Sequence, residues 1–101
     1  MIDPIHQFMV DFTLPEELSG EFMELIPFQR AVVNRYLSEG SLVNYALALE
    51  QAKLWAVFKA NSEMEVLEML ADFPLTPFMQ IEINELTSFH TAESTPAFSL
   101  N

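Results

Sequence analysis

The chain has 101 residues, of which 50% are apolar, and its formal net charge of −11 comes from 15 acidic against only four basic side chains. So few basic residues cannot form the positive surface that nucleic acid or an anionic membrane requires, and we expect neither as a partner. No apolar run approaches the roughly 20 residues that span a bilayer, and no signal peptide is evident, which predicts a cytoplasmic protein.

The first expected element is a β-strand over residues 6–13, where apolar and polar side chains alternate. Phe8, Val10 and Phe12 point to one face of this strand, and the side chains between them point to the other. One face of the strand is therefore expected in the core.

The region from residue 18 to residue 37 is predicted to be helical, because its apolar side chains recur with the helical period. Pro27 interrupts this region, and a proline inside a helix removes a hydrogen bond and clashes with the preceding turn. We therefore expect a kink, or two abutting helices, near Ile26. Gly40 is expected to end the region, because glycine readily takes the left-handed conformation.

Two further strands are expected over residues 41–49 and 54–60. The short link of residues 50–53 makes them a hairpin, although it contains neither Gly nor Asn and does not specify a turn type. Strict alternation returns over residues 78–86, which predicts a fourth strand.

A second helix is expected between the hairpin and the last strand. Ser62 and Glu65 have the spacing of a capping box, in which each side chain bonds a backbone N–H at the start of a helix. The buried stripe of this helix is predicted to consist of Val66, Leu67, Leu70 and Phe73.

The resulting order, β-α-β-β-α-β, is that of a ferredoxin-like α+β fold, an antiparallel sheet with both helices on one face. The other face is left uncovered, and in a chain this apolar we expect a second copy to cover it, giving a homodimer. A single domain over residues 1–90 accounts for these elements. The tail, residues 91–101, is expected to pack on a neighbouring subunit, because Phe89, Phe98 and Leu100 stand in or just before it as apolar anchors. The alternative is a disordered tail.

The uncovered face is also the candidate site. If Phe8, Val10 and Phe12 face the helices, Asp11 and Glu82 share the opposite face on neighbouring strands. We expect a cavity there, lined by Asp11, Glu82, Tyr45, Trp55 and Lys59, with Met9 and Gln80 beside them. A carboxylate in such a cavity has a raised proton affinity and can act as a general base. Alternatively, Asp11 and Glu82 are solvated at strand ends, or pair with Lys59 across a dimer interface.

Little else in the sequence carries chemistry. The absence of cysteine excludes disulfides and thiolate ligands, and His6 and His90 lack the paired spacing of a metal site. Gly20 and Gly40 are the only glycines, so no phosphate-binding loop is expected. These residues predict acid–base chemistry without a metal or a tightly held cofactor.

Several segments resemble the muconolactone delta-isomerases. They are Glu39-Gly40, Trp55-Ala56-Val57-Phe58, the helix that starts at Ser62, and above all Phe73-Pro74-Leu75-Thr76-Pro77-Phe78-Met79-Gln80-Ile81-Glu82-Ile83. The resemblance implies a dimeric α+β barrel, often built into larger rings. It also implies a cofactor-free proton transfer that moves a double bond in an unsaturated lactone. Because Glu82 lies in the matching segment, we expect it to be the acid–base group.

Asp11 and Tyr45 are then expected to assist Glu82, while Lys59, Trp55, Met9 and Gln80 bind the substrate. The strand over residues 41–49 carries no charge in its interior, which favours a mostly neutral cyclic or enol-type substrate. The alternative is a non-catalytic binding or assembly module with the same fold, because a fold alone does not carry function. A cofactor-independent monooxygenase is a third, weaker hypothesis, based on Trp55 and Tyr45.

Overall fold

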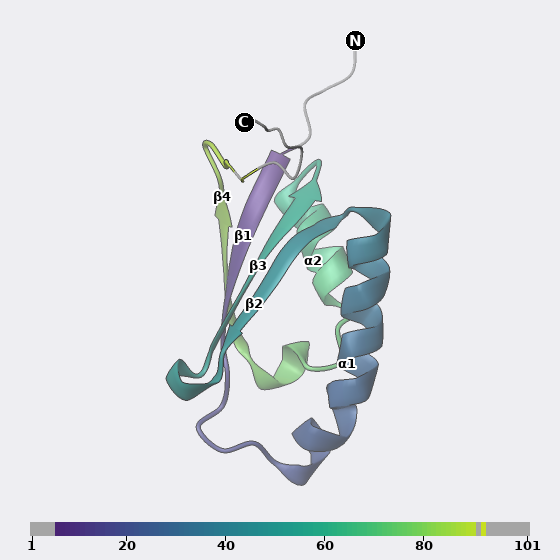
Figure 1. The fold of residues 1–101 in the computed structure, drawn as a ribbon, viewed down its shortest axis with the longest axis vertical. Coiled ribbons are helices and arrows are strands. Elements are labelled where there is room, and N and C mark those ends of the chain that lie inside the picture. Colours follow the sequence, from purple (N-terminus) through teal and green to yellow (C-terminus); the bar gives the residue numbers. More distant parts are fainter. Residues whose placement is uncertain (1–5, 91, 93–101) are drawn as a thin grey trace.

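The computed structural model describes residues 6–90 and residue 92. Its elements are β1 (His6–Thr13), α1 (Gly20–Glu39), β2 (Leu42–Ala48), the 3-10 turn η1 (Leu49–Gln51), β3 (Lys53–Ala60), α2 (Glu63–Leu70), the 3-10 turn η2 (Thr76–Phe78) and β4 (Gln80–Glu85). The strands form one antiparallel sheet in the order β2-β3-β1-β4, and both helices cover the same face (Figure 1). The ferredoxin-like α+β fold expected from the sequence is confirmed.

The helix-covered face of the sheet holds the core. Phe8, Val10 and Phe12 are buried there, as the alternation of β1 predicts. Phe73 packs between two other rings, 5.7 Å from Tyr36 and 5.9 Å from Phe58 between ring centroids. The rings therefore tie α1 and β3 to the segment that follows α2.

The stripe expected on α2 is only partly right. Val66 and Leu70 are buried, and Phe73 is buried beyond the end of the helix, but Leu67 is 44% exposed. With only two turns, α2 presents a narrow apolar face to the sheet, and Leu67 lies beside that face. Half of the expected capping box is present, since the Glu65 N–H donates to Ser62 Oγ at 3.2 Å. The Glu65 carboxylate accepts from the N–H of Asn61 at 2.9 Å, one residue before the position that a capping box uses.

Pro27 lies inside α1, which runs as one helix from Gly20 to Glu39. The expectation of two abutting helices is therefore wrong. Pro27 is on the exposed side of the helix, so water can bond the carbonyl that the proline leaves without a partner. Gly40 ends the helix in the left-handed conformation, with φ of 85°, as predicted.

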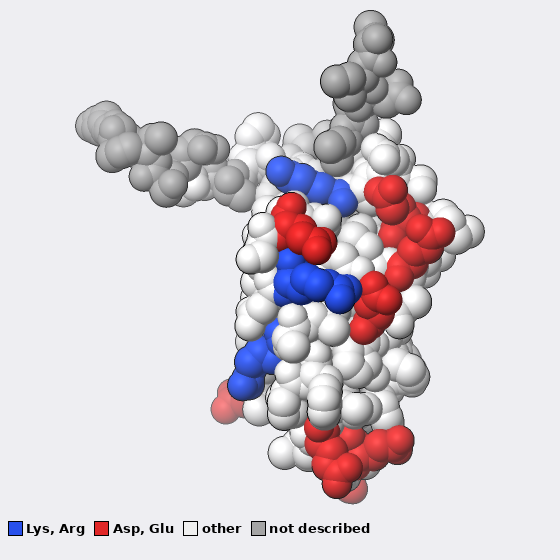
Figure 2. Space-filling view, turned by 90° about the vertical axis from the view of Figure 1, so that its right-hand side faces the viewer, with Lys and Arg blue, Asp and Glu red and all other residues white. Residues whose placement is uncertain are grey.

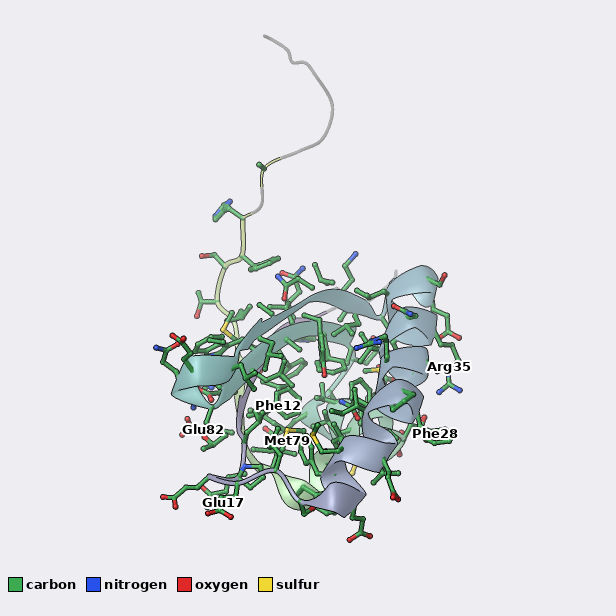
Figure 3. The ribbon with its side chains drawn as sticks, turned by 60° about the horizontal axis from the view of Figure 1, so that its bottom comes forward. Phe12, Glu17, Phe28, Arg35, Met79 and Glu82 are labelled. Carbon is green, nitrogen blue, oxygen red and sulfur yellow. The ribbon has the colours of Figure 1, made fainter. Side chains whose placement is uncertain are left out.

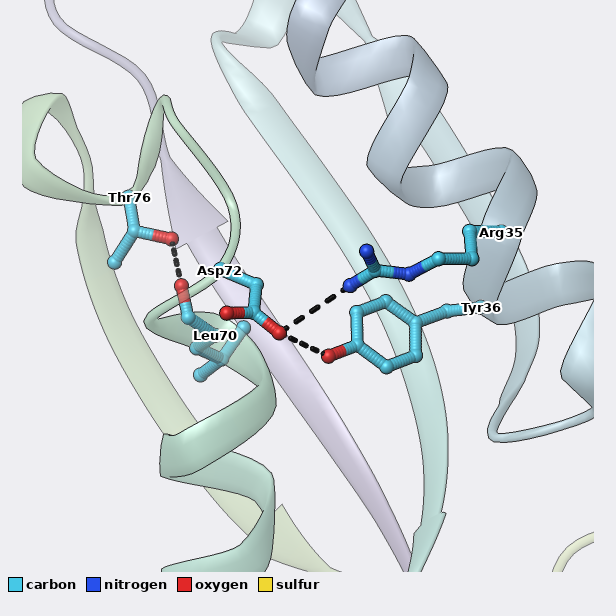
Figure 4. A network of polar contacts seen from close by, with 5 residues as sticks. All are labelled: Arg35, Tyr36, Leu70, Asp72 and Thr76. Carbon is cyan, nitrogen blue, oxygen red and sulfur yellow. Dashed lines mark hydrogen bonds and ion pairs between the residues drawn. The ribbon is translucent and has the colours of Figure 1, made fainter.

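A polar contact joins the two helices at the surface (Figure 4). The carboxylate of Asp72, just after α2, accepts hydrogen bonds from the Tyr36 hydroxyl and from Arg35 Nη2, the latter at 3.3 Å. Nearby, Thr76 Oγ1 donates to the carbonyl of Leu70 at 2.8 Å and closes the last turn of α2. These contacts attach the loop between α2 and β4 to α1 on one side and to the last turn of α2 on the other.

One expectation falls on residues that the structure does not describe. The tail of residues 91–101 falls outside the described residues except for Ala92, so its packing stays a prediction. Within the described residues, neither helix is long and apolar enough to cross a bilayer.

Candidate functional site

Asp11 lies on the open face of the sheet, the face opposite α1 and α2, with a neighbour on each side. It pairs with Trp55 on β3 and with Glu82 on β4. Opposed side chains of an antiparallel pair point to one face, with Cβ atoms about 5 Å apart. The register therefore places the Asp11 and Glu82 carboxylates side by side, with the Trp55 indole beyond Asp11.

Two more of the expected site residues flank this row. Met9 pairs with Asn84, one pleat along β1 from Asp11, and Gln80 pairs with Thr13 in the other direction. In Figure 3, Glu82 points away from the body of the molecule, whereas Phe12 and Met79 lie between the sheet and α1. Glu82 is exposed, and no ion pair involves it among the described residues.

Lys53 is the cation that lies beside these carboxylates, and it is not among the site residues expected from the sequence. Its ammonium group forms an ion pair with Asp11 Oδ1 and donates to Thr13 Oγ1 at 3.0 Å. Both charged side chains are only 27% exposed, and the buried Oδ1 has no other partner in the described part of the chain. The sequence predicts Lys53 in the hairpin link, whereas the structure places it at the start of β3. It shares the phase of Trp55, and that phase is the sequence signal that identifies it.

Lys59 does not reach the carboxylates. It pairs with Gln7, four residues along β1 from Asp11, or about 13 Å away at the usual rise of a strand. There it lines a shallow hollow with Glu39 and Glu65. Lys59 and the carboxylate pair therefore do not line one cavity, because strand register separates them along the sheet.

Tyr45 is on the opposite face from the carboxylates, which corrects its expected position in the same cavity. Leu42 pairs with Phe58, and continuing that register would set Tyr45 opposite Trp55 on the open face. The register slips between Leu42 and Asn44, so Tyr45 pairs with Ala56 instead and points toward α1. A slip of one residue moves every later side chain of a strand to the other face.

Tyr45 lines a cavity of about 510 Å³ between α1 and the helix-covered face of the sheet. The lining is mostly aliphatic and aromatic, and includes Phe22, Val33 and Leu54. Ligand sites are typically cavities of this size, with a mainly apolar lining and a few polar groups. No local sequence pattern indicates this cavity, because it forms only where α1 crosses the sheet.

Gln29 supplies the polar wall of this cavity and is only 4% exposed. Its Nε2 donates to the Tyr45 hydroxyl at 3.0 Å, and its Oε1 accepts from the Leu75 N–H at 3.0 Å. Burial raises the pKa of Tyr45, and the Gln29 hydrogen bond opposes part of that rise. Tyr45 is therefore a neutral phenol at physiological pH, able to donate a hydrogen bond but not to act as a base.

Charge on the outer side of the molecule is mixed. On the face shown in Figure 2, basic side chains lie down one side, and acidic side chains gather beside and below them. Among residues 6–90 and 92, no three His, Cys, Asp or Glu side chains converge as a metal site. The groups available for chemistry are thus the open-face carboxylates with Lys53, and the donors of the cavity.

An antiparallel sheet covered on one face by two helices defines a ferredoxin-like α+β protein, and here two carboxylates lie side by side on the other face. The family model of muconolactone delta-isomerase matches residues 7–92, and the chain belongs to this family. A crystal structure of muconolactone isomerase matches with a TM-score of 0.67 and 23% identity, covering 86% of this chain and 98% of that chain. A comparison with curated proteins gave no match.

Proposed function

We propose that this chain is a cofactor-free isomerase that moves a proton within a small unsaturated lactone or enol-type substrate. Family membership supports an isomerase-like function, while the substrate and the residues below are our proposal. The observation that carries it is the placement of Glu82 directly opposite Asp11, whose charge Lys53 neutralises. The two carboxylates thus have different partners, which fits them to different tasks.

In this mechanism Glu82 is the base. In a lactone whose double bond starts one carbon further along the ring, the Glu82 carboxylate removes a proton from the carbon next to the carbonyl. The C–H electron pair moves toward the carbonyl oxygen to give a dienolate. Lys53, held by Asp11 and Thr13, stabilises the negative oxygen. The protonated Glu82 then returns the proton to a different carbon, which shifts the double bond. Trp55, Met9 and Gln80 contact the ring of the substrate.

A second copy of the chain completes the site in this proposal. Neither α1 nor α2 covers the open face, and Glu82 is exposed there in the described part of one subunit. A second sheet packed on this face would exclude water from the carboxylates and strengthen their interactions with the substrate. The expected assembly is therefore a homodimer, whose mass light scattering measures at micromolar concentration.

Glu82→Gln tests the chemistry, because it keeps the shape of the side chain and removes the base. Incubated in D₂O with a panel of unsaturated five-membered lactones, the parent protein should exchange a C–H next to the carbonyl for deuterium, as seen by proton NMR. Glu82→Gln should exchange about a hundredfold more slowly. Glu68→Gln, at an exposed position on α2, is the matched control and should equal the parent.

The alternative is a non-catalytic module that binds a small molecule. The cavity under α1 favours it, because that cavity lies on the other side of the sheet from both carboxylates. If no lactone of the panel exchanges, or Glu82→Gln matches the parent, the isomerase proposal is wrong and binding is the remaining function.

A further inference from the structure

We propose that Asp11 makes the open face selective for uncharged lactones, because it occupies the cation that could otherwise hold a substrate carboxylate. This inference rests on the proposed isomerase function and assigns the substrate class of that site. Asp11 is then a specificity-determining residue that acts through Lys53, and not a group that reacts with the substrate. The sequence favours a neutral substrate because β2 carries no charge, and the structure identifies the residue that selects it.

The Lys53 ammonium group already has two partners. It forms an ion pair with Asp11 Oδ1 and donates to Thr13 Oγ1 at 3.0 Å. An ammonium group has three N–H donors, so one remains for a substrate oxygen. This donor suffices for the carbonyl oxygen of a lactone. A substrate carboxylate would instead have to compete for the positive charge with Asp11, which the sheet holds permanently beside it.

The other basic side chains cannot supply the missing charge. Lys59 lies about 13 Å away along the sheet at the usual rise of a strand, which is farther than a small lactone extends. Arg30 and Arg35 are on α1, on the opposite side of the sheet (Figure 1), and Arg35 is in an ion pair with Asp72. The chain has only four Lys and Arg residues, and the structure describes all of them. No unpaired Lys or Arg therefore lies beside Glu82.

Glu82 repels an anionic substrate in addition. It lies directly opposite Asp11, so this part of the face carries two carboxylates against one ammonium group. Repulsion between like charges strengthens where water is excluded, as it would be under a second sheet. A second copy of the chain has the same groups on its own open face, so it brings no unpaired cation to this place. An uncharged lactone avoids the repulsion and still reaches Lys53 and Glu82.

Two ligands of equal size and different charge test this selectivity. The acid is a five-membered unsaturated lactone that bears a carboxylate on a one-carbon arm, and the amide is the same lactone with a carboxamide there. In D₂O the parent protein should exchange the C–H next to the ring carbonyl at least about tenfold faster in the amide than in the acid, after subtraction of uncatalysed exchange. Added salt should narrow this difference, because it screens the repulsion.

Asp11→Asn assigns the selectivity to one residue. It keeps the shape of the side chain and frees the charge of Lys53, so the acid should gain on the amide by about tenfold or more. Glu68→Gln removes the same charge at an exposed position on α2 and should keep the preference of the parent. Melting curves show whether each variant is folded. If Asp11→Asn does not fold, the preference of the parent and its dependence on salt decide the question.

Binding separates this inference from the proposed chemistry. The saturated analogues of the acid and the amide have no double bond to shift, and the fluorescence of Trp55, the only tryptophan, reports their binding. The amide analogue should bind the parent at least about tenfold more tightly than the acid analogue, even where Glu82→Gln shows that the isomerase proposal is wrong. Absence of binding, equal or tighter binding of the acid, a preference that salt does not narrow, or an unchanged preference in folded Asp11→Asn would each overturn the inference.

Discussion

The side-chain oxygen of Asn44 accepts a hydrogen bond of 3.2 Å from the backbone N–H of Val57, at the point where β2 and β3 slip by one residue. The slip leaves this N–H without a backbone acceptor, and the asparagine supplies one. The same slip turns Tyr45 from the open face to the cavity. A single polar side chain therefore supports the arrangement that separates the two candidate sites.

Asn44→Ala should destabilise the protein by about 1–3 kcal/mol, because the N–H of the fully buried Val57 would lose its partner. Urea denaturation measures the change in the free energy of unfolding. Asn84→Ala is the matched control, since Asn84 is exposed on β4 and has no side-chain hydrogen bond among the described residues. Equal stability of the two variants would show that the bond at the slip contributes nothing.

The two tyrosines of the chain should ionise at higher pH than free tyrosine. Burial raises the pKa of Tyr45, and burial together with the Asp72 hydrogen bond raises that of Tyr36. Because the folded pKa of each lies above the unfolded value, their contribution to stability is complete below about pH 10 and is lost as the pH rises further. Absorbance at the phenolate band measures this ionisation in the folded protein.

Gln29→Leu separates Tyr45 from Tyr36 in that titration. Loss of the Gln29 hydrogen bond should raise the pKa of Tyr45 further, because that bond lowers it. In the background of Tyr36→Phe only Tyr45 titrates, so the shift is assigned without ambiguity. Gln29→Leu also leaves the Leu75 N–H without its acceptor, and should cost about 1–3 kcal/mol of stability. An unchanged or lowered pKa of Tyr45 would contradict the prediction that the Gln29 hydrogen bond lowers this pKa.

Lys53→Met should destabilise the protein by about 1–3 kcal/mol, because the half-buried Asp11 carboxylate would lose its counter-ion. Lys59→Met changes the same residue type at an exposed position and should alter stability by less than about 0.5 kcal/mol. The double variant Asp11→Asn/Lys53→Met should lose less than the sum of the single changes, since the two side chains are in contact. Additive losses would exclude a direct interaction.

Phe73→Ala should cost about 3–5 kcal/mol, because the ring is buried and packs against Tyr36 and Phe58. Phe28→Ala removes the same side chain at a position on α1 that is 64% exposed and points outward (Figure 3), and should change stability by about 0.5 kcal/mol or less. Thermal and urea denaturation compare the two. If Phe28→Ala is equally destabilising at concentrations that favour association, Phe28 is buried in an oligomer.

The sequence by itself determined the order of the elements, because strand and helix periods are local properties of a few neighbouring residues. It also determined the cap at Ser62, the end of α1 at Gly40, and the shared face of Asp11 and Glu82, since alternation fixes which side chains face together. It did not determine whether α1 continues through Pro27 as one helix. A proline weakens a helix locally, but whether the helix breaks depends on what covers each side of it.

Only the tertiary structure decided the rest of the site. The slip between Leu42 and Asn44 reverses the face of Tyr45, and no local pattern reveals it, because it depends on how β2 pairs with a different strand. Lys53 is the partner of Asp11 because β1 pairs with β3, which brings together two residues that are far apart in the chain. The cavity exists because α1 crosses the sheet, so that Gln29 meets Tyr45 and the loop before β4. Such placements are set by long-range packing, whereas the residues themselves follow from the sequence.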